Sequence, residues 1–116
     1  METIVVADDD RVFRQLLATV FDLEGYRAVV VTTPEDVVPT VRREAPAVVL
    51  MDIHFRSQDT LGALRELKGD QALSEIPVIM TSGMDRADEC LAAGADAFLL
   101  KPFRPSEMLA KIRDLA

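Results

Sequence analysis

Five short runs of apolar residues divide the chain at regular intervals, and polar residues follow most of them. An unbroken apolar run is typical of a strand buried on both faces of a parallel sheet. We therefore expect five strands, at residues Thr3–Ala7, Tyr26–Val31, Ala47–Met51, Val78–Met80 and Ala97–Leu100. The central run leads directly into Asp52, which places a carboxylate at the end of its strand.

Between these runs, apolar residues recur at three- and four-residue spacings, which indicates amphipathic helices. The expected helices are Arg11–Glu24, Pro34–Glu44, Thr60–Leu67, Arg86–Ala93 and a last one that begins at Pro105. In the first helix, six apolar side chains form a wide stripe expected to pack on the sheet: Val12, Phe13, Leu16, Leu17, Val20 and Phe21.

Local signals mark where several elements begin and end. Asp10 is suited to cap the first helix, and Gly25 to end it. Pro39 lies inside the second predicted helix, so it either kinks that helix or delays its start. Residues Ile53–Asp59 are expected to form a loop.

Strand and helix alternate five times without a gap. Because crossover connections between parallel strands are right-handed, this alternation predicts a doubly wound α/β sandwich with helices on both faces. The eightfold barrel needs roughly 250 residues, and this chain has 116. We expect one domain that spans residues 1–116.

Composition narrows the classes of partner. The formal net charge of −7 disfavours direct binding to nucleic acid or to anionic membranes, because both need a basic surface. The single cysteine, Cys90, cannot form an internal disulfide, which fits a reducing compartment. No signal peptide or membrane-length apolar span is evident. The expectation is a soluble cytoplasmic protein.

Three carboxylates, on Asp8, Asp9 and Asp52, follow predicted strands that would be neighbours in the sheet. Like charges at close range repel unless a cation lies among them, and Mg²⁺ prefers such hard oxygen ligands. The plainer reading of the acidic run is a charged helix start, and Asp10 is expected to have only that role.

The other strand ends add a hydroxyl, on Ser82, and an ammonium, on Lys101. With a metal present, a carboxylate can attack phosphorus to form an aspartyl phosphate. Phosphoryl transfer depends mainly on positioning and charge neutralisation, which a metal, Lys101 and Ser82 would supply. The sequence therefore predicts a phosphoryl-transfer site at the edge of the sheet where these parallel strands end.

Four segments carry a resemblance that covers essentially the whole chain: Ile4–Asp10, Val49–Ile53, Pro77–Gly83 and Gly94–Phe103. Together they resemble the receiver domain of two-component response regulators. The resemblance implies a flavodoxin-like sheet of strand order 2-1-3-4-5 and a phosphoryl group accepted from the phosphohistidine of a sensor kinase or phosphotransfer protein. It adds an unknown downstream partner, and a phosphorylation-dependent homodimer stays open.

Carried over by position, the resemblance implies that Asp52 is the phosphoacceptor and that Mg²⁺, or Mn²⁺, is the cofactor. Asp9 would bind the metal directly together with Asp52, and Asp8 would help through water. The main-chain carbonyl of His54 would complete the protein ligands. Lys101 would pair with both acceptor and phosphate.

The same resemblance implies a switch. Ser82 matches the family's Ser/Thr position and Phe98 its aromatic position. A new dianion on the acceptor would draw Ser82 inward, and Phe98 would fill the space. The surface of the fourth helix, fifth strand and last helix would then change. The bond between Lys101 and Pro102 is expected to be cis.

Departures from the family cluster after Asp52, where Phe55, Arg56 and Thr60 stand in place of a usual Met-Pro pair and a glycine. Losing that proline and glycine removes two constraints on the path of the loop. The Arg56 side chain is expected to point to water.

The leading hypothesis is a phosphorylation-controlled signalling module. It would catalyse its own phosphorylation and dephosphorylation but act on no metabolic substrate, so it is not expected to be an enzyme in the metabolic sense. The alternative is a degenerate receiver that acts as a phosphorylation-independent interaction domain. An aspartate-nucleophile phosphatase is disfavoured because His54 stands where a second acid is often found. A nucleotide-binding protein is disfavoured because no glycine-rich loop follows the first strand.

Overall fold

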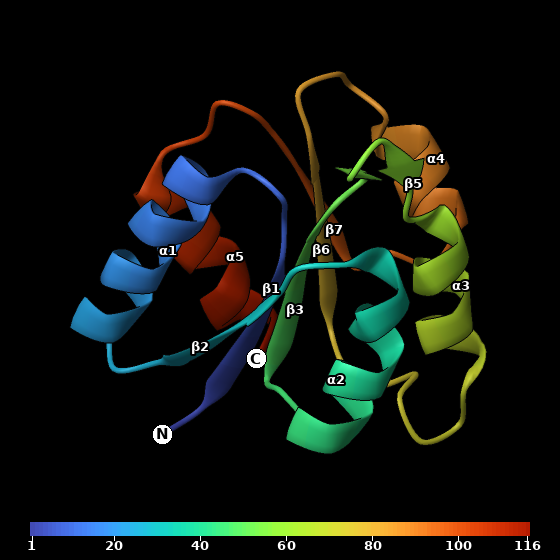
Figure 1. Ribbon diagram of the computed structural model, residues 1–116, viewed down its shortest axis with the longest axis horizontal. Helices are drawn as coiled ribbons and strands as arrows, with labels where there is room; N and C mark the ends of the chain where they lie inside the picture. The colour runs from blue at the N-terminus through green and yellow to red at the C-terminus, as the bar shows by residue number, and fades with distance from the viewer.

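The computed structural model describes residues 1–116 and contains a five-stranded sheet with helices on both sides (Figure 1). Its strands lie in the order β2-β1-β3-β6-β7, and every neighbouring pair is parallel. They are β1 Thr3–Ala7, β2 Arg27–Val31, β3 Val48–Asp52, β6 Val78–Ser82 and β7 Ala97–Leu100. With the two strands of a separate hairpin left out, this is the predicted order 2-1-3-4-5, so the fold prediction is confirmed.

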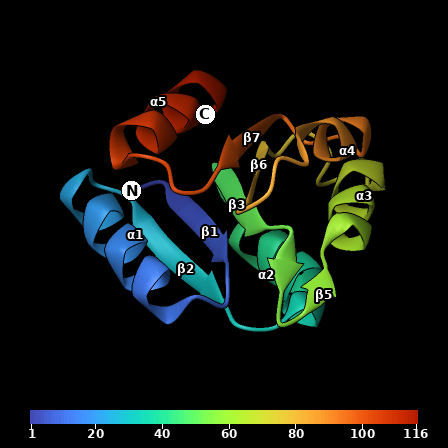
Figure 2. The same ribbon diagram turned by 90° about the horizontal axis from the view of Figure 1, so that it is seen from above.

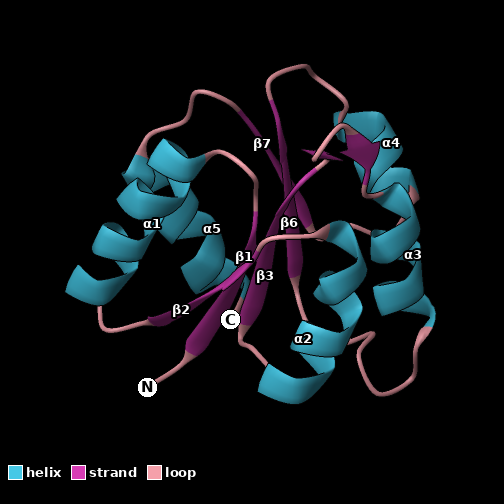
Figure 3. Cartoon of the chain, in the orientation of Figure 1, coloured by secondary structure: helices cyan, strands magenta, loops and turns pink.

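Five α-helices connect the strands (Figure 3). They are α1 Arg11–Leu23, α2 Val37–Glu44, α3 Leu61–Gly69, α4 Ala87–Ala92 and α5 Pro105–Leu115. Figure 2 shows α1 and α5 on one face of the sheet and α2, α3 and α4 on the other. None of these helices is both long enough and apolar enough to cross a lipid bilayer.

Each face of the sheet has its own hydrophobic core. Along β1, Val5 and Ala7 belong to the core under α2, α3 and α4, whereas Ile4 and Val6 belong to the core under α1 and α5. All four are essentially unexposed. This alternation is the reason that the strand sequence is apolar at every position, as a sheet covered on both faces requires.

Helix α1 begins where the sequence predicts. The Asp10 carboxylate accepts a hydrogen bond from the Phe13 amide at 3.0 Å, which caps the helix. The expected apolar stripe is only partly correct, however, because Val12 and Leu16 are 77% and 49% exposed. Leu17 and Phe21, displaced by about 140° around the helix from that row, are the side chains that are fully buried.

Pro39 delays the start of the second helix. A 3₁₀ turn, η1 at Pro34–Asp36, comes first, and α2 then begins at Val37. Pro39 therefore lies in the first turn of α2, where an amide has no partner inside the helix and its absence costs nothing. The two possibilities left open by the sequence are thus resolved in favour of a later start.

The segment after Asp52 is a β-hairpin, so the expectation of a loop was wrong. Strands β4 (His54–Phe55) and β5 (Gln58–Asp59) pair in antiparallel fashion. The two residues between them, Arg56 and Ser57, have φ angles of 51° and 60°. Positive φ at both positions is the geometry of a two-residue hairpin turn.

Two side chains replace the constraints that a proline and a glycine would have supplied. Phe55 has no exposed surface and packs into the core under α2, α3 and α4, which anchors the hairpin. Thr60, at the N-terminus of α3, is 1% exposed, and its hydroxyl donates to the Asp52 carbonyl at 2.8 Å. The path of this segment is therefore defined from both ends.

Two buried threonines differ in one respect that can be tested. Thr60 and Thr81 are each 1% exposed, but the hydroxyl of Thr81, on β6, has no hydrogen-bond partner. Because valine has nearly the same shape, Thr81→Val should raise the free energy of unfolding by about 1 kcal/mol. Thr60→Val should lower it by about 1 kcal/mol, because the Asp52 carbonyl loses a donor. Urea unfolding of both variants measures the difference, and equal signs would contradict this reading.

Candidate functional site

The acidic site lies where the connections of the sheet change direction. The chain passes from β1 outward to β2 on one side, and from β3 outward to β6 on the other. In open α/β sheets, the carboxyl edge at such a point forms a crevice in which ligands bind. Asp8 directly follows β1 and Asp52 is the last residue of β3, so both carboxylates stand at this point.

Lys101, which follows β7, joins the two carboxylates. Its ammonium lies 2.8 Å from Asp8 Oδ2 and 2.7 Å from Asp52 Oδ2. The Asp8 and Asp52 side chains are only 3% and 12% exposed, and that of Lys101 is 21% exposed. Buried charges are tolerated when they are paired in this way. The Lys101–Pro102 bond is cis, as the resemblance implied.

The pKa values of Asp8 and Lys101 are both raised, which disfavours the charge of Asp8 and favours that of Lys101. Burial is the larger influence on Asp8 and raises the pKa of its carboxyl, against hydrogen bonds from Lys101 and from the Asp10 amide. Burial opposes the charge of Lys101 as well, but hydrogen bonds to Asp52 and Asp8 outweigh it, so the pKa of Lys101 is raised. The charged form of Lys101 is favoured because it has two carboxylate partners. The charged form of Asp8 is disfavoured because Asp8 is more deeply buried and shares one ammonium with Asp52.

Asp9 does not share the Lys101 contact. Its Oδ2 accepts a hydrogen bond from the Arg56 amide at 2.9 Å, at the tip of the hairpin. No three of the chain's acidic, histidine or cysteine side chains are grouped as metal ligands. The structure thus brings Asp8 and Asp52 together with Lys101 but does not bring Asp9 into the same contact.

The donor set nevertheless fits a hard divalent cation. Three carboxylates (Asp8, Asp9, Asp52) and one ammonium (Lys101) leave two formal negative charges at the edge of the sheet. Carboxylate oxygens are the ligands that Mg²⁺ and similar ions prefer. The Arg56 amide uses only Oδ2 of Asp9, so Oδ1 has acceptor capacity for such an ion.

His54 contributes its main chain to the site. Its amide donates to Asp52 Oδ1 at 2.9 Å, so the two oxygens of Asp52 have different partners. The His54 imidazole is instead directed to Arg86, with 3.3 Å between Nε2 and the guanidinium. The predicted role of its carbonyl as a metal ligand stays a prediction.

The predicted switch residues lie on the two strands beyond β3. Ser82 ends β6, is 1% exposed, and its hydroxyl accepts a hydrogen bond from the Met84 amide at 3.1 Å. Phe98 on β7 is half-buried and packs against the core under α2, α3 and α4. Their switching roles stay predictions, but both residues occupy the elements that the sequence assigned to them.

Three contacts of the site were not anticipated from the sequence. The Lys101 ammonium lies 4.3 Å from the centre of the Phe13 ring, a cation–π contact. Arg56 is exposed, as expected, but its guanidinium also donates a hydrogen bond to the Thr32 carbonyl at 2.6 Å. The Thr60 hydroxyl holds the Asp52 carbonyl. No motif signals such contacts, because each joins residues that only folding brings together.

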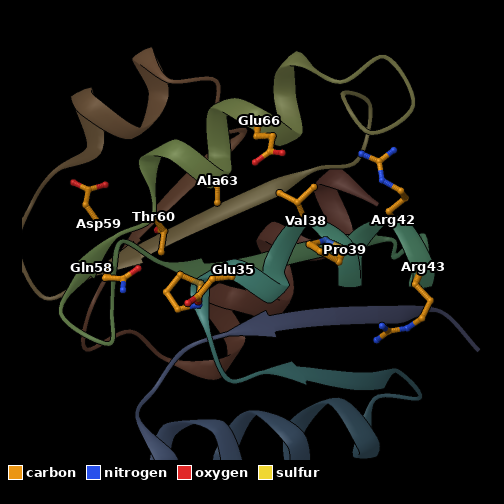
Figure 4. Close-up of a pocket in the computed structure, with 11 residues that line it drawn as sticks. Glu35, Val38, Pro39, Arg42, Arg43, Gln58, Asp59, Thr60, Ala63 and Glu66 are labelled. Carbon is orange, nitrogen blue, oxygen red and sulfur yellow. The ribbon is translucent and has the colours of Figure 1, made fainter.

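The largest surface groove lies beside this site and does not contain it. It has a volume of about 750 Å³ and is lined by η1, α2, the hairpin and α3 (Figure 4). Thr60 and Asp59 lie at one end, and Arg42 and Arg43 at the other. Neither Asp52 nor Lys101 lines it, so the groove is separate from the chemistry described above.

Fold and site together define a doubly wound α/β protein with paired carboxylates and one lysine at the carboxyl edge of its sheet. Residues 4–113 match the family model of the response regulator receiver domain. The chain therefore belongs to that family and is a receiver domain of two-component response regulators.

Individual relatives agree with this assignment. The probable transcriptional regulator ycf27 of Guillardia theta is 34% identical over 115 residues, which are 97% of this chain and 44% of that protein. The chain spans about half the length of the curated relatives it matches. The BeF3-activated N-terminal receiver domain of Klebsiella pneumoniae RstA is 26% identical, with a TM-score of 0.88 and 97% of each chain covered.

A third similarity concerns the fold alone. The receiver domain of the sensor histidine kinase PA1611 from Pseudomonas aeruginosa, solved with a magnesium ion in its active-site cleft, has a TM-score of 0.88 at 24% identity. The match covers 98% of this chain and 96% of that one.

The raised pKa of Asp8 predicts how stability depends on pH. As pH rises from the ordinary value of 3.8 through the raised one, the folded state retains a proton that the unfolded state has lost. The contribution of Asp8 to stability therefore falls over this window. Asp8→Asn removes that fall, so its stability relative to the wild type should increase from acid to neutral pH. Urea unfolding in the presence of a chelator, at several pH values, measures this trend.

Glu44→Gln provides a control of opposite sign. Hydrogen bonds from Arg27 and then Arg43 lower the pKa of Glu44. Its stabilising contribution is present above the ordinary value of 4.5 and is lost as pH falls through the lowered one. This variant should therefore lose stability relative to the wild type as pH rises. A pH-independent difference for Asp8→Asn would contradict the account of its burial.

Proposed function

We propose that Asp52 accepts a phosphoryl group from the phosphohistidine of a sensor histidine kinase or phosphotransfer protein, in a reaction that depends on Mg²⁺ or Mn²⁺. The observation that carries this proposal is the Asp52 carboxylate held between the Lys101 ammonium and the His54 amide at the switch point of the sheet. The RstA relative, which is BeF3-activated, supports it.

In the transfer itself, a carboxylate oxygen of Asp52 forms a bond to phosphorus while the phosphorus–nitrogen bond to the donor imidazole breaks. The released imidazole nitrogen takes up a proton. Lys101 neutralises charge on the phosphoryl oxygens, since its ammonium already lies 2.7 Å from the acceptor. Because the site is charged before the donor arrives, little reorganisation is needed at the moment of transfer.

A bound divalent ion would supply further positive charge to the phosphoryl oxygens. Asp8, Asp9, Asp52 and the His54 carbonyl would hold it. Because Asp9 also accepts a hydrogen bond from the Arg56 amide, an ion bound to Asp9 would act on the main chain at the tip of the hairpin. The magnesium ion in the PA1611 receiver domain is consistent with this assignment.

The readout would pass through Ser82 and Phe98. A phosphoryl group on Asp52 would offer a strong acceptor to the proton of the Ser82 hydroxyl, which in the present contact accepts a hydrogen bond from the Met84 amide. Phe98 would then occupy the space that Ser82 leaves, and the surface of α4, β7 and α5 would change. Leu91 on α4 and Leu100 on β7 are about half exposed on these elements and provide apolar contact area for a downstream protein or a second copy of the chain.

The module acts on no metabolic substrate in this proposal, and we place it in the cytoplasm, where sensor kinases present their phosphohistidine.

The alternative function, a phosphorylation-independent interaction domain, is favoured by one observation. Asp9 accepts a hydrogen bond from the Arg56 amide and does not join the contact of Asp8, Asp52 and Lys101. The two functions differ in whether Asp52 takes up phosphate at all.

Incubation with Mg²⁺ and acetyl phosphate, followed by intact mass measurement, separates the two functions. The wild type should gain the mass of one phosphoryl group, and the gain should be lost on addition of a chelator. Asp52→Asn should gain nothing, because the nucleophile is absent. Asp10→Asn is the matched control, since asparagine also caps a helix and Asp10 only caps α1.

An unmodified wild type, in protein shown to be folded by circular dichroism, would refute phosphoryl acceptance and favour the interaction domain. Phosphate uptake by Asp52→Asn would instead show that another residue is the acceptor.

A further inference from the structure

Arg86 connects the N-terminus of α4 to the hairpin that follows Asp52. Its side chain is only 16% exposed, which is unusual for an arginine that precedes a surface helix. The guanidinium lies 2.6 Å from Glu89, in the first turn of α4, and 3.3 Å from Asp59 on β5. It also lies 3.3 Å from Nε2 of His54 on β4.

His54 and Asp59 are directly opposite each other in the hairpin. One guanidinium therefore contacts both strands of the hairpin, at paired residues, and also the first turn of α4. Arginine is suited to this role because its planar group carries five donors and keeps its charge at any physiological pH. The contacts from Arg86 tie the hairpin and α4 into one unit.

The same hairpin touches two carboxylates of the acidic site through its main chain. The His54 amide donates to Asp52, and the Arg56 amide donates to Asp9. Any change in the charge or position of these carboxylates acts directly on the hairpin backbone. Through Arg86, that change is only one side chain away from the start of α4.

Helix α4 depends on such contacts because it is weak by itself. It has six residues, Ala87–Ala92, and its N-cap residue makes no side-chain cap. Isolated helices of this length are not stable in water. Only Cys90 of α4 is fully buried. The position of α4 is therefore set by a few packed or ion-paired residues, among them Arg86.

We propose that Arg86 is a positioning residue that transmits the state of Asp52 and Asp9 to α4 through the hairpin. This forms a second connection between the acidic site and α4, parallel to the one through Ser82 and Phe98. The inference rests on the proposed function, since it describes how the phosphorylated state would reach the partner surface. Arg86 makes no contact with Asp52 itself, and it acts through His54 and Asp59.

The chain contains a matched control for the local part of this arrangement. Arg104 stands at the N-cap of α5 and pairs with Glu107, three residues further on, at 3.2 Å. Arg86 and Glu89 form the same i,i+3 pair at the start of α4. The Arg104 side chain, however, is 84% exposed and has no contact with the hairpin. Arg104→Ala therefore removes a helix-start ion pair without removing a connection to the site.

Amide hydrogen exchange of the purified chain, with and without Mg²⁺ and beryllium fluoride as the phosphoryl mimic, tests the proposal. In the wild type, adding the mimic should change exchange at residues 87–92 as well as around Ser82 and Lys101. In Arg86→Ala, the response around Ser82 and Lys101 should persist while the response of α4 shrinks by roughly 2- to 30-fold, the range for residues that modulate coupling between sites. Arg104→Ala should respond as the wild type does.

Asp59→Asn is a milder second variant. Asp59 Oδ1 accepts the Leu61 amide at the start of α3, and asparagine retains an oxygen for that contact. The charge that faces Arg86 is removed, while the Arg86–Glu89 pair stays. The response of α4 should again be reduced, in a protein whose helices are all retained.

Two results overturn the proposal, and they are distinguishable. An α4 response of wild-type size in both Arg86→Ala and Asp59→Asn would show that the hairpin carries no coupling. A wild type that responds nowhere, and gains no mass with acetyl phosphate, would refute the proposed function and the coupling together.

Discussion

One ammonium group holds the functional edge of this protein together. Asp8 and Asp52 end adjacent strands, so the sheet forces two carboxylates into a buried crevice where they would repel each other. Lys101 lies within 2.8 Å of both carboxylates and neutralises part of their charge. The ring of Phe13, on α1, lies 4.3 Å from the Lys101 ammonium. With Asp9 included, the site still carries two formal negative charges, which favours the binding of a cation.

The hairpin after Asp52 gives this receiver domain a local character of its own. Phe55 fixes it to the core, Thr60 fixes its exit to the Asp52 carbonyl, and its main-chain amides reach Asp9 and Asp52. A flexible loop would absorb changes at the acidic site. A hairpin anchored at several points would instead be displaced by them, and Arg86, which contacts both of its strands, would transmit that displacement to α4.

The groove between α2 and α3 and the acidic site meet at the hairpin without merging. Thr60 and Asp59 line the groove, while Thr60 also bonds to Asp52 and Asp59 to Arg86. The hairpin thus adjoins three regions of the surface: the acidic edge, the groove and α4.

The sequence alone determined the strands, the doubly wound class and the residues at the strand ends, because burial on both faces demands unbroken apolar runs and because parallel strands end at one edge. It misjudged α1, since a stripe that includes Val12 and Leu16 is wider than the surface the helix covers. It also gave no sign of the hairpin, because Arg56 and Ser57 are not the usual turn residues. The contacts that hold it, among them the burial of Phe55 and the bonds to Thr32 and Asp9, form only in the folded chain. The resemblance already implied that Lys101 pairs with Asp52. Tertiary structure alone decided that Asp8 shares this lysine, that Asp9 bonds to the hairpin and what Arg86 joins, since these contacts connect residues far apart in the chain.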